Sequence, residues 1–177
     1  MFRSLLSAAG VLTATILVAT GGLVSSAYAH VTLEHNQAPV GAPYKAVLQV
    51  PHGCDGSATT AIRVRIPEGV LDVKPMPKPG WTLNLVKGKY SKAHSFHRAQ
   101  ISEGVTEIDW TGGNLPDDYY DEFVFQSVLA SDLQAGQTVY FPVVQECEKG
   151  IHRWIEIPTA GSDYPEPAPG LKLLPQP

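Results

Sequence analysis

The sequence lacks the features that define several large functional classes. No segment shows a convincing 3.6-residue helical period, and the 13 Lys and Arg residues form no basic cluster. The formal net charge is −4, so neither nucleic acid nor an anionic membrane surface is an expected partner. GxSxG, Walker, HExxH and dinucleotide-binding motifs are also absent, which leaves no recognisable catalytic motif.

Long apolar runs are equally scarce, and the one candidate lies at the N-terminus. Arg3 gives a weakly positive start, residues 11–24 are apolar apart from small or hydroxylated residues, and Ala-Tyr-Ala at 27–29 fits the pattern of signal-peptide cleavage. A retained anchor needs about 20 well-filled apolar residues, whereas glycine and serine pairs interrupt this run. We therefore expect residues 1–29 to be a secretory signal peptide, after whose removal the protein is soluble in the periplasm.

Cleavage after Ala29 defines the expected domain organisation. Removing residues 1–29 from the 177 leaves 148 residues, with a formal charge of −5 because Arg3 is lost. This length is typical of one domain with its own core. We expect that domain to span residues 30–163. Residues 164–177 contain five prolines, which disfavour a central strand, so we expect an extended, solvated tail there.

Cysteine is scarce too, since the chain contains only Cys54 and Cys147. Disulfides persist outside the cytoplasm, and an even count without a CxxC motif favours one bridge over a thiolate metal cluster. We therefore predict a Cys54–Cys147 disulfide, which would stabilise the fold by roughly 4 kcal/mol on the chain-entropy model. The alternative is a pair of free thiols that bind Cu(I), a soft ion that thiolates favour.

The mature chain is rich in short, strand-like segments. Residues 44–50 and 62–66 alternate apolar with polar side chains, and both segments stop at a proline. Clusters of Gly, Pro, Asn and Asp separate the further candidates, which are residues 81–86, 93–101, 106–110, 122–129, 138–144 and 151–157. This spacing predicts an all-β fold, a single antiparallel β-sandwich of the immunoglobulin or cupredoxin type.

His30 becomes the first residue if cleavage follows Ala29. An N-terminal histidine offers its amine and a ring nitrogen to the same ion, and nitrogen ligation in a tetragonal plane suits Cu(II). The free amine has a pKa near ~7.7–8.0, so a metal displaces its proton at neutral pH at little cost. Two nitrogens alone leave the coordination incomplete, and the alternative is a solvated terminus.

Further ligands are available beside the two cysteines. His52 and Asp55 flank Cys54, and Glu146 precedes Cys147. The predicted disulfide would bring an imidazole and carboxylates into one neighbourhood, although the sequence does not place His30 there. His52 has an alternative role as a turn residue that hydrogen-bonds to the backbone.

Trp154 is the other unusual residue. The period-2 pattern of residues 151–157 places Trp154 on the same strand face as His152 and Glu156. An indole among polar neighbours suits a metal site, where it shields an ion from water or covers it with its π face. The alternative is an aromatic residue that caps a sheet. His35, His94 and His97 are expected to be surface residues, and the acidic residues 117–122 a solvated loop.

The chain resembles the YcnI-like copper-binding proteins of bacteria. The resemblance rests on AHVTLE directly after the signal, YKAVLQVPHGCDGSATTAIRVRIPEGV, VKPMPKPGWTL, DDYYDEFVF, YFPVVQECEKG and RWIEIP, which cover nearly the whole mature chain. The family implies an exported β-sandwich that binds Cu(II) through the amine and imidazole of its first histidine, with a carboxylate and a tryptophan nearby. In this chain the histidine is His30 and the tryptophan is Trp154.

The carboxylate is the point at which this chain departs from the family. Gram-positive members carry an acid in the loop where this sequence reads PHGCDG, so His52 or Asp55 takes its place, or Glu146 across the disulfide. The expected function is Cu(II) sequestration or delivery in periplasmic copper homeostasis, in exchange with another copper-transport protein and without catalysis. Two alternatives remain: a copper oxidoreductase resembling the polysaccharide monooxygenases, with His52 completing a histidine brace, and a metal-free adhesion module.

Overall fold

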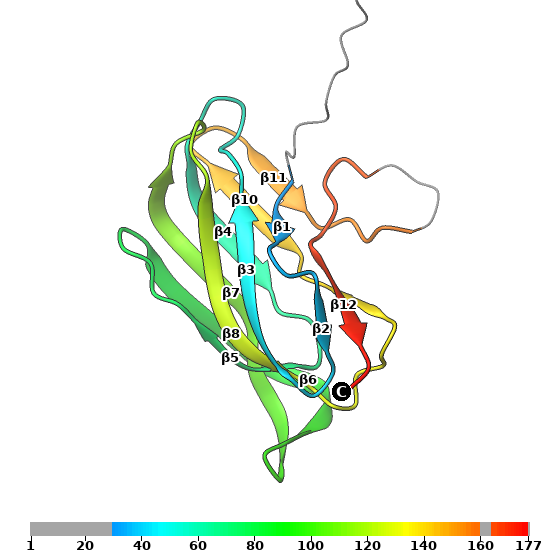
Figure 1. The fold of residues 1–177 in the computed structure, drawn as a ribbon. Coiled ribbons are helices and arrows are strands. Elements are labelled where there is room, and N and C mark those ends of the chain that lie inside the picture. Colours follow the sequence, from blue (N-terminus) through cyan, green and yellow to red (C-terminus); the bar gives the residue numbers. More distant parts are fainter. Residues whose placement is uncertain (1–29, 160–163, 177) are drawn as a thin grey trace, which may run out of the picture.

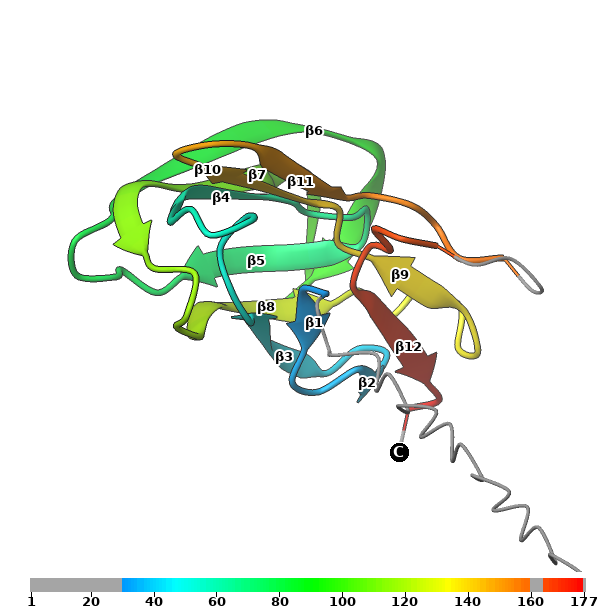
Figure 2. The ribbon, with the colours of Figure 1, turned by 90° about the horizontal axis from the view of Figure 1, so that it is seen from above.

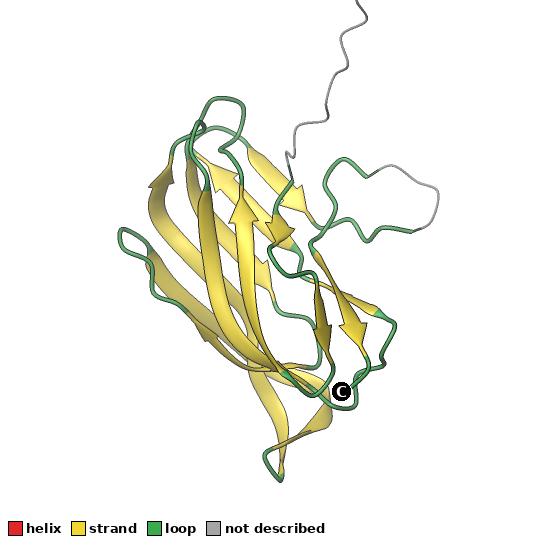
Figure 3. Ribbon diagram, viewed as in Figure 1, coloured by secondary structure: helices red, strands yellow, loops and turns green. Residues whose placement is uncertain are grey.

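Strands and loops make up the whole of the described structure, a computed structural model that covers residues 30–159 and 164–176 (Figure 3). Within these ranges no helix is long and apolar enough to cross a bilayer. The expected signal peptide, residues 1–29, lies outside the described residues. The prediction of an all-β fold is confirmed.

Two antiparallel sheets face each other and form the two layers of a sandwich (Figures 1 and 2). The first has the order β1-β3-β8-β5, with strands Thr32–Leu33, Pro43–Val50, Asp121–Leu129 and Val70–Pro75. The second has the order β11-β10-β4-β7-β6, with strands Ile151–Trp154, Val143–Cys147, Thr59–Arg65, Ala99–Leu115 and Thr82–Phe96.

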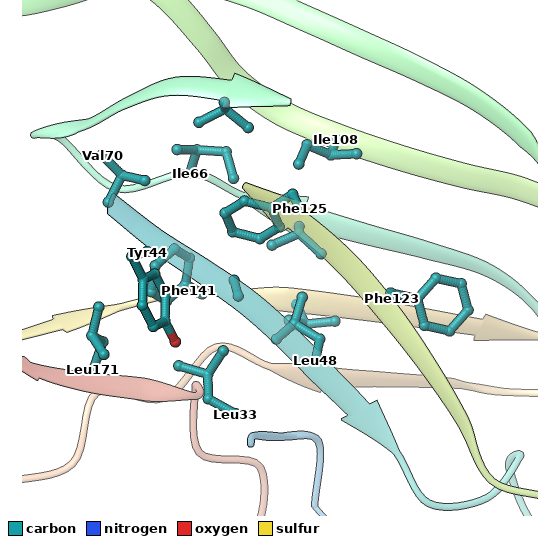
Figure 4. Close-up of a cluster of buried hydrophobic side chains, with 14 of the residues drawn as sticks. Leu33, Tyr44, Leu48, Ile66, Val70, Ile108, Phe123, Phe125, Phe141 and Leu171 are labelled. Atoms are coloured by element: carbon teal, nitrogen blue, oxygen red, sulfur yellow. The ribbon is translucent and has the colours of Figure 1, made fainter. Parts of the chain in front are cut away.

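The core lies between the two sheets because each strand turns alternate apolar side chains inward. Figure 4 shows part of this cluster, in which Phe125 from β8 lies near Ile108 from β7. Trp110, Phe123, Phe125 and Phe141 are all fully buried. Burial of these aromatic side chains supplies much of the hydrophobic stabilisation of the fold.

A third, three-stranded sheet closes one side of the sandwich, in the order β2-β12-β9. Its strands are Gln37–Pro39, Gly170–Leu174 and Thr138–Tyr140. β12 pairs in parallel with β2 and antiparallel with β9, and its residues Leu171 and Leu173 are buried in the main core. The prediction of a solvated tail over residues 164–177 is therefore wrong. The prolines lie on either side of β12, and the alternation of leucine with Lys172 inside it forms an ordinary half-buried strand.

Two further strand predictions need correction, and one strand was not predicted. Residues 93–101 form a hairpin, because His97 and Arg98, both with positive φ, make a two-residue turn between β6 and β7. The segment 138–144 is divided at Pro142 into β9 and β10. β5 escaped prediction because its pairing with β8 shifts register at Asp72, which has φ 49°, so its apolar residues do not alternate regularly.

The predicted Cys54–Cys147 disulfide is present. It joins the loop between β3 and β4 to the last residue of β10 and spans 93 residues of sequence. The loop has the tight turn Cys54–Ser57, in which each of these two residues donates its backbone N–H to the carbonyl of the other at 2.9 Å. His52 and its neighbours are thereby held against the second sheet.

Candidate metal centre

His30 and Trp154, which the family resemblance assigns to one site, lie next to each other. His30 is exposed and lies two residues before β1, which is fixed by its pairing with β3. The two ring centroids are 5.5 Å apart with an edge-on geometry. Trp154 is 3% exposed, so the indole is a rigid wall against which the His30 imidazole rests.

Gln145 fixes the indole in place. It is 1% exposed, and its Oε1 accepts the Trp154 indole N–H at 3.0 Å. Its Nε2 donates to the His52 carbonyl and to Thr59 Oγ1, both at 2.8 Å. One buried amide thus ties Trp154 to the loop that carries His52. Because Gln145 pairs with His152 and Val143 with Trp154 across β10 and β11, these side chains share the inner face, and the predicted common face of His152 and Trp154 is confirmed.

His152 is a neighbour of the site that was not singled out from the sequence. Its ring stacks on Trp154, with centroids 5.0 Å apart and an interplanar angle of 30°. Its Nδ1 donates to Glu166 Oε1 at 2.7 Å, and Glu166 Oε2 accepts the backbone N–H of Arg153 at 2.9 Å. Burial alone would raise the pKa of Glu166, but these hydrogen bonds outweigh it and lower the pKa below its ordinary value.

His52 is a further neighbour of His152, and the centroids of the two histidine rings are 6.4 Å apart. The rings of His52, His152, Trp154 and His30 therefore form a row of successive contacts. His52 Nδ1 lies 2.6 Å from the Gly53 carbonyl, to which it donates. The predicted backbone hydrogen bond of a turn histidine is thus present, alongside a histidine neighbour that the sequence did not reveal.

The two predicted carboxylate ligands lie apart from this row. Glu146 projects from the face of β10 opposite to Gln145 and accepts a hydrogen bond from Arg63 Nε at 2.9 Å. Asp55 is exposed in the Cys54–Ser57 turn with φ 47°. Within the described ranges, neither makes a hydrogen bond or ion pair with His30. No group of three or more His, Cys, Asp or Glu side chains among the described residues is arranged to hold a metal ion.

The segment before β12 forms one wall of the site. A shallow hollow of about 200 Å³ lies beside His30, bounded by residues 30–33, Asn36 and residues 167–170. This wall is held in place because Ala168 donates its backbone N–H to the Glu156 carbonyl at 2.8 Å. Glu166 precedes the wall. No local pattern in the sequence connects Glu166 or this wall with His30 or His152, because their proximity depends on the chain returning through β12.

His94 does not lie on the surface as predicted. It is 1% exposed, and its Nε2 and Nδ1 contact Glu68 at 2.9 Å and Asp132 at 3.1 Å. Its strand, β6, is longer than expected and crosses the two loops that carry these acids. The two nitrogens of one ring point to two different carboxylates, so these three side chains do not converge on a common metal position.

The fold is a disulfide-linked β-sandwich of the immunoglobulin-like class, and His30, His52 and His152 lie near one end of it. The crystal structure of an uncharacterized protein from Nocardia farcinica with an immunoglobulin-like fold is similar to it, with a TM-score of 0.61 and 27% identity over 82% of this chain and 98% of that chain. No curated protein matches the chain.

A family model described as a domain of unknown function, DUF1775, matches residues 30–173. The chain belongs to this family, which is that of the YcnI-like proteins, so the resemblance is confirmed at the level of the family. The matched region begins at His30 and ends within β12, at Leu173.

Proposed function

We propose that the mature protein binds Cu(II) through the amine and imidazole of His30 and serves copper homeostasis in the periplasm. The observation that carries this proposal is the contact of His30 with a buried, hydrogen-bonded Trp154. Cleavage after Ala29 would create the amine two residues before a paired strand, so both nitrogens would belong to a fixed part of the fold.

The residues present fit a copper cargo in donor type. The two His30 nitrogens match the tetragonal preference of Cu(II), and the indole wall would limit the approach of water from one side. With Glu146 held by Arg63 and Asp55 exposed in a turn, water or a partner residue would complete the coordination. An incomplete protein shell suits a protein that exchanges copper with another periplasmic transport protein, and it needs no catalytic acid or base.

The proposal is tested by moving the amine. In a mature protein extended by one alanine before His30, the imidazole remains but the amine is displaced, and we expect Cu(II) affinity at this site to fall roughly tenfold or more, which corresponds to about 1.4 kcal/mol. Calorimetric titration and electron paramagnetic resonance would measure the change, after mass spectrometry has established the first residue of each protein.

Two further variants complete the experiment. His30→Ala retains an N-terminal amine without the imidazole and should also lose the site. His97→Asn removes an exposed histidine at the far hairpin, where asparagine tolerates the positive φ, and should bind as the unmodified protein does. Equal affinity of the extended and unextended proteins would refute the terminal chelate.

A further inference from the structure

We propose that the protein forms a symmetric dimer in which the outer faces of the first sheet, β1-β3-β8-β5, pack against each other. This outer face is the side of the sheet away from the core, and Figure 1 views the molecule from that side, with β3 and β8 in front. None of the residues argued below belongs to the candidate metal centre, so the dimer is independent of the copper chelate.

The alternation along β8 determines which of its side chains lie on the outer face. Phe123 and Phe125 are fully buried in the core, so their neighbours Glu122, Val124 and Gln126 point to the opposite side of the sheet. Along the strand, the outer face therefore changes from an acidic to an apolar and then to a polar side chain.

The neighbouring strands extend these positions into rows that cross the sheet. Gln126 pairs with Lys45 of β3 and with Lys74 of β5, which gives a row with a lysine on each side. The Val124 carbonyl accepts the backbone N–H of Met76, directly after β5, at 2.8 Å, which gives an apolar row. The apolar row thus lies between Glu122 and the two lysines.

Two large side chains on this face are exposed to solvent. Met76 and Tyr120 are each 53% exposed. The Tyr120 hydroxyl donates to the Glu122 carboxylate and accepts a hydrogen bond from Gln49 Nε2 at 3.4 Å, which holds the ring at the acidic end of the face. Exposed methionine and tyrosine side chains are typical of the residues that protein interfaces bury.

A two-fold axis along the apolar row makes the outer face complementary to itself. An isologous contact has its axis in the plane of the interface, and rotation about this axis exchanges the rows on its two sides. Glu122 of one copy then lies over Gln126 of the other copy, between Lys45 and Lys74 of that copy. Val124 meets its own counterpart on the axis, so apolar contacts lie in the centre and opposite charges at both ends.

Tyr120 fits the same arrangement. It lies two residues before Glu122, and Val128 lies two residues after Gln126, so the rotation places Tyr120 of one copy at Val128 of the other. A hollow of about 360 Å³ lies at that place, bounded in part by Pro43 and Val128. The tyrosine of each copy would therefore enter the hollow of the other.

The size of the face determines how tight the dimer is. From Tyr120 to Val128 the chain extends about 27 Å, and four strands about 4.8 Å apart cover about 19 Å. The contact would bury about 500 Å² of each copy, or about 1,000 Å² in total, which is the lower end for a specific interface. We therefore expect a weak dimer that dissociates on dilution.

Lys45 is the lysine on which the charge contact depends most. It is exposed, whereas Lys74 already pairs with Asp72 at 2.9 Å. Opposite charges across an interface orient the partners, and like charges placed in contact cost several kcal/mol. Reversing the charge of either Glu122 or Lys45 should therefore oppose the dimer.

The experiment is sedimentation equilibrium of the mature protein from about 10 µM to about 1 mM. The unmodified protein should pass from monomer to dimer as the concentration rises. Glu122→Lys and Lys45→Glu should each raise the dissociation constant about tenfold or more. Lys89→Glu is the matched control, because it makes the same charge change at an exposed position of β6 in the other sheet, and it should dimerise as the unmodified protein does.

An equimolar mixture of Glu122→Lys and Lys45→Glu provides the sharpest test. In a dimer with one copy of each, the new lysine faces the new glutamate, and the unchanged Lys45 faces the unchanged Glu122. The mixture should therefore associate at least tenfold more tightly than either variant alone. Circular dichroism would verify the fold of each variant, and Tyr120→Ala, which leaves the charges unaltered, should weaken the dimer about tenfold.

Three results would overturn this dimer. A protein that is monomeric up to about 1 mM leaves the outer face to a different partner. A dimer that neither charge reversal weakens uses another face. A mixture that associates no more tightly than its two components does not have the two-fold arrangement.

Discussion

His94 and His152 both face carboxylates, yet the two side chains have different surroundings. His152 uses one nitrogen and is partly exposed, whereas buried His94 presents both nitrogens to carboxylate oxygens. Each ring nitrogen of His94 thus has a carboxylate partner from a different loop. His94 therefore connects β6 to the two loops that carry Glu68 and Asp132.

The His94 cluster should make stability depend on acid pH. Hydrogen bonds from His94 and Ser91 lower the pKa of Glu68 although burial opposes them, and Lys92 together with His94 lowers that of Asp132. A lowered carboxyl pKa stabilises the fold above the unfolded pKa, and this stability is lost as pH falls through the folded pKa. Urea midpoints of the unmodified protein should therefore fall between about pH 5 and pH 3.

His94→Gln is the comparison for that measurement. Without the imidazole, the midpoint should be lower at pH 5 and should change less toward pH 3. The two acids are partly exposed, so added salt should reduce the difference between the proteins. An identical acid-induced drop in both proteins would contradict the role given to His94.

The sequence was most informative where a residue's own pattern carried the signal. His30 followed a cleavage motif, and Trp154 alternated with polar neighbours, and the structure brings these two rings together. His152 shared the face of Trp154 but had no visible partner, because Glu166 lies 14 residues away in a segment that was expected to be solvated. Contacts of that kind depend on tertiary structure and leave no local period to detect.

At the level of elements, β12 determines how the site is built. The segment leading into it forms the wall beside His30, and the strand itself fills a side of the core (Figure 4). The composition of residues 164–177 predicted an extended tail and no strand, because five prolines lie on the two sides of this five-residue strand. The hairpin between β6 and β7 was predicted as one continuous strand. His97 and Arg98 form its turn, where glycine or asparagine is usual, so the sequence contains no turn signal there.

Leu171→Ala should show that β12 belongs to the domain. The side chain is fully buried, and truncation of a buried leucine costs about 2–5 kcal/mol. The neighbouring variant Lys172→Ala alters an exposed side chain of the same strand and should change the free energy of unfolding by less than about 0.5 kcal/mol. Urea denaturation of both proteins measures the two values, and similar small effects would mean that β12 is dispensable.

At the level of the whole molecule, one covalent bond joins the two halves of the chain. The Cys54–Cys147 disulfide closes 93 residues of sequence, and it lies next to the loop that carries His52. It is also what an oxidising compartment would maintain. The loop that carries His52 is therefore held both by the disulfide and by the hydrogen bond from Gln145.

Reduction of this disulfide should lower the free energy of unfolding by about 4–5 kcal/mol on the chain-entropy model. Thermal unfolding with and without dithiothreitol measures the effect. The double variant Cys54→Ala, Cys147→Ala should unfold at a lower temperature than the oxidised protein and should not respond to the reductant. A reductant effect in that variant would show that the loss has another cause.

The parallel pairing of β2 with β12 has a practical consequence for producing the protein. The last strand runs away from the His30 end, so that β12 ends at the opposite end of the sandwich (Figure 1). A purification handle fused upstream of His30 would abolish the amine under study, whereas one fused downstream of Leu174 would emerge far from it. Recombinant protein should therefore be prepared with His30 as its first residue and with the purification handle after Leu174.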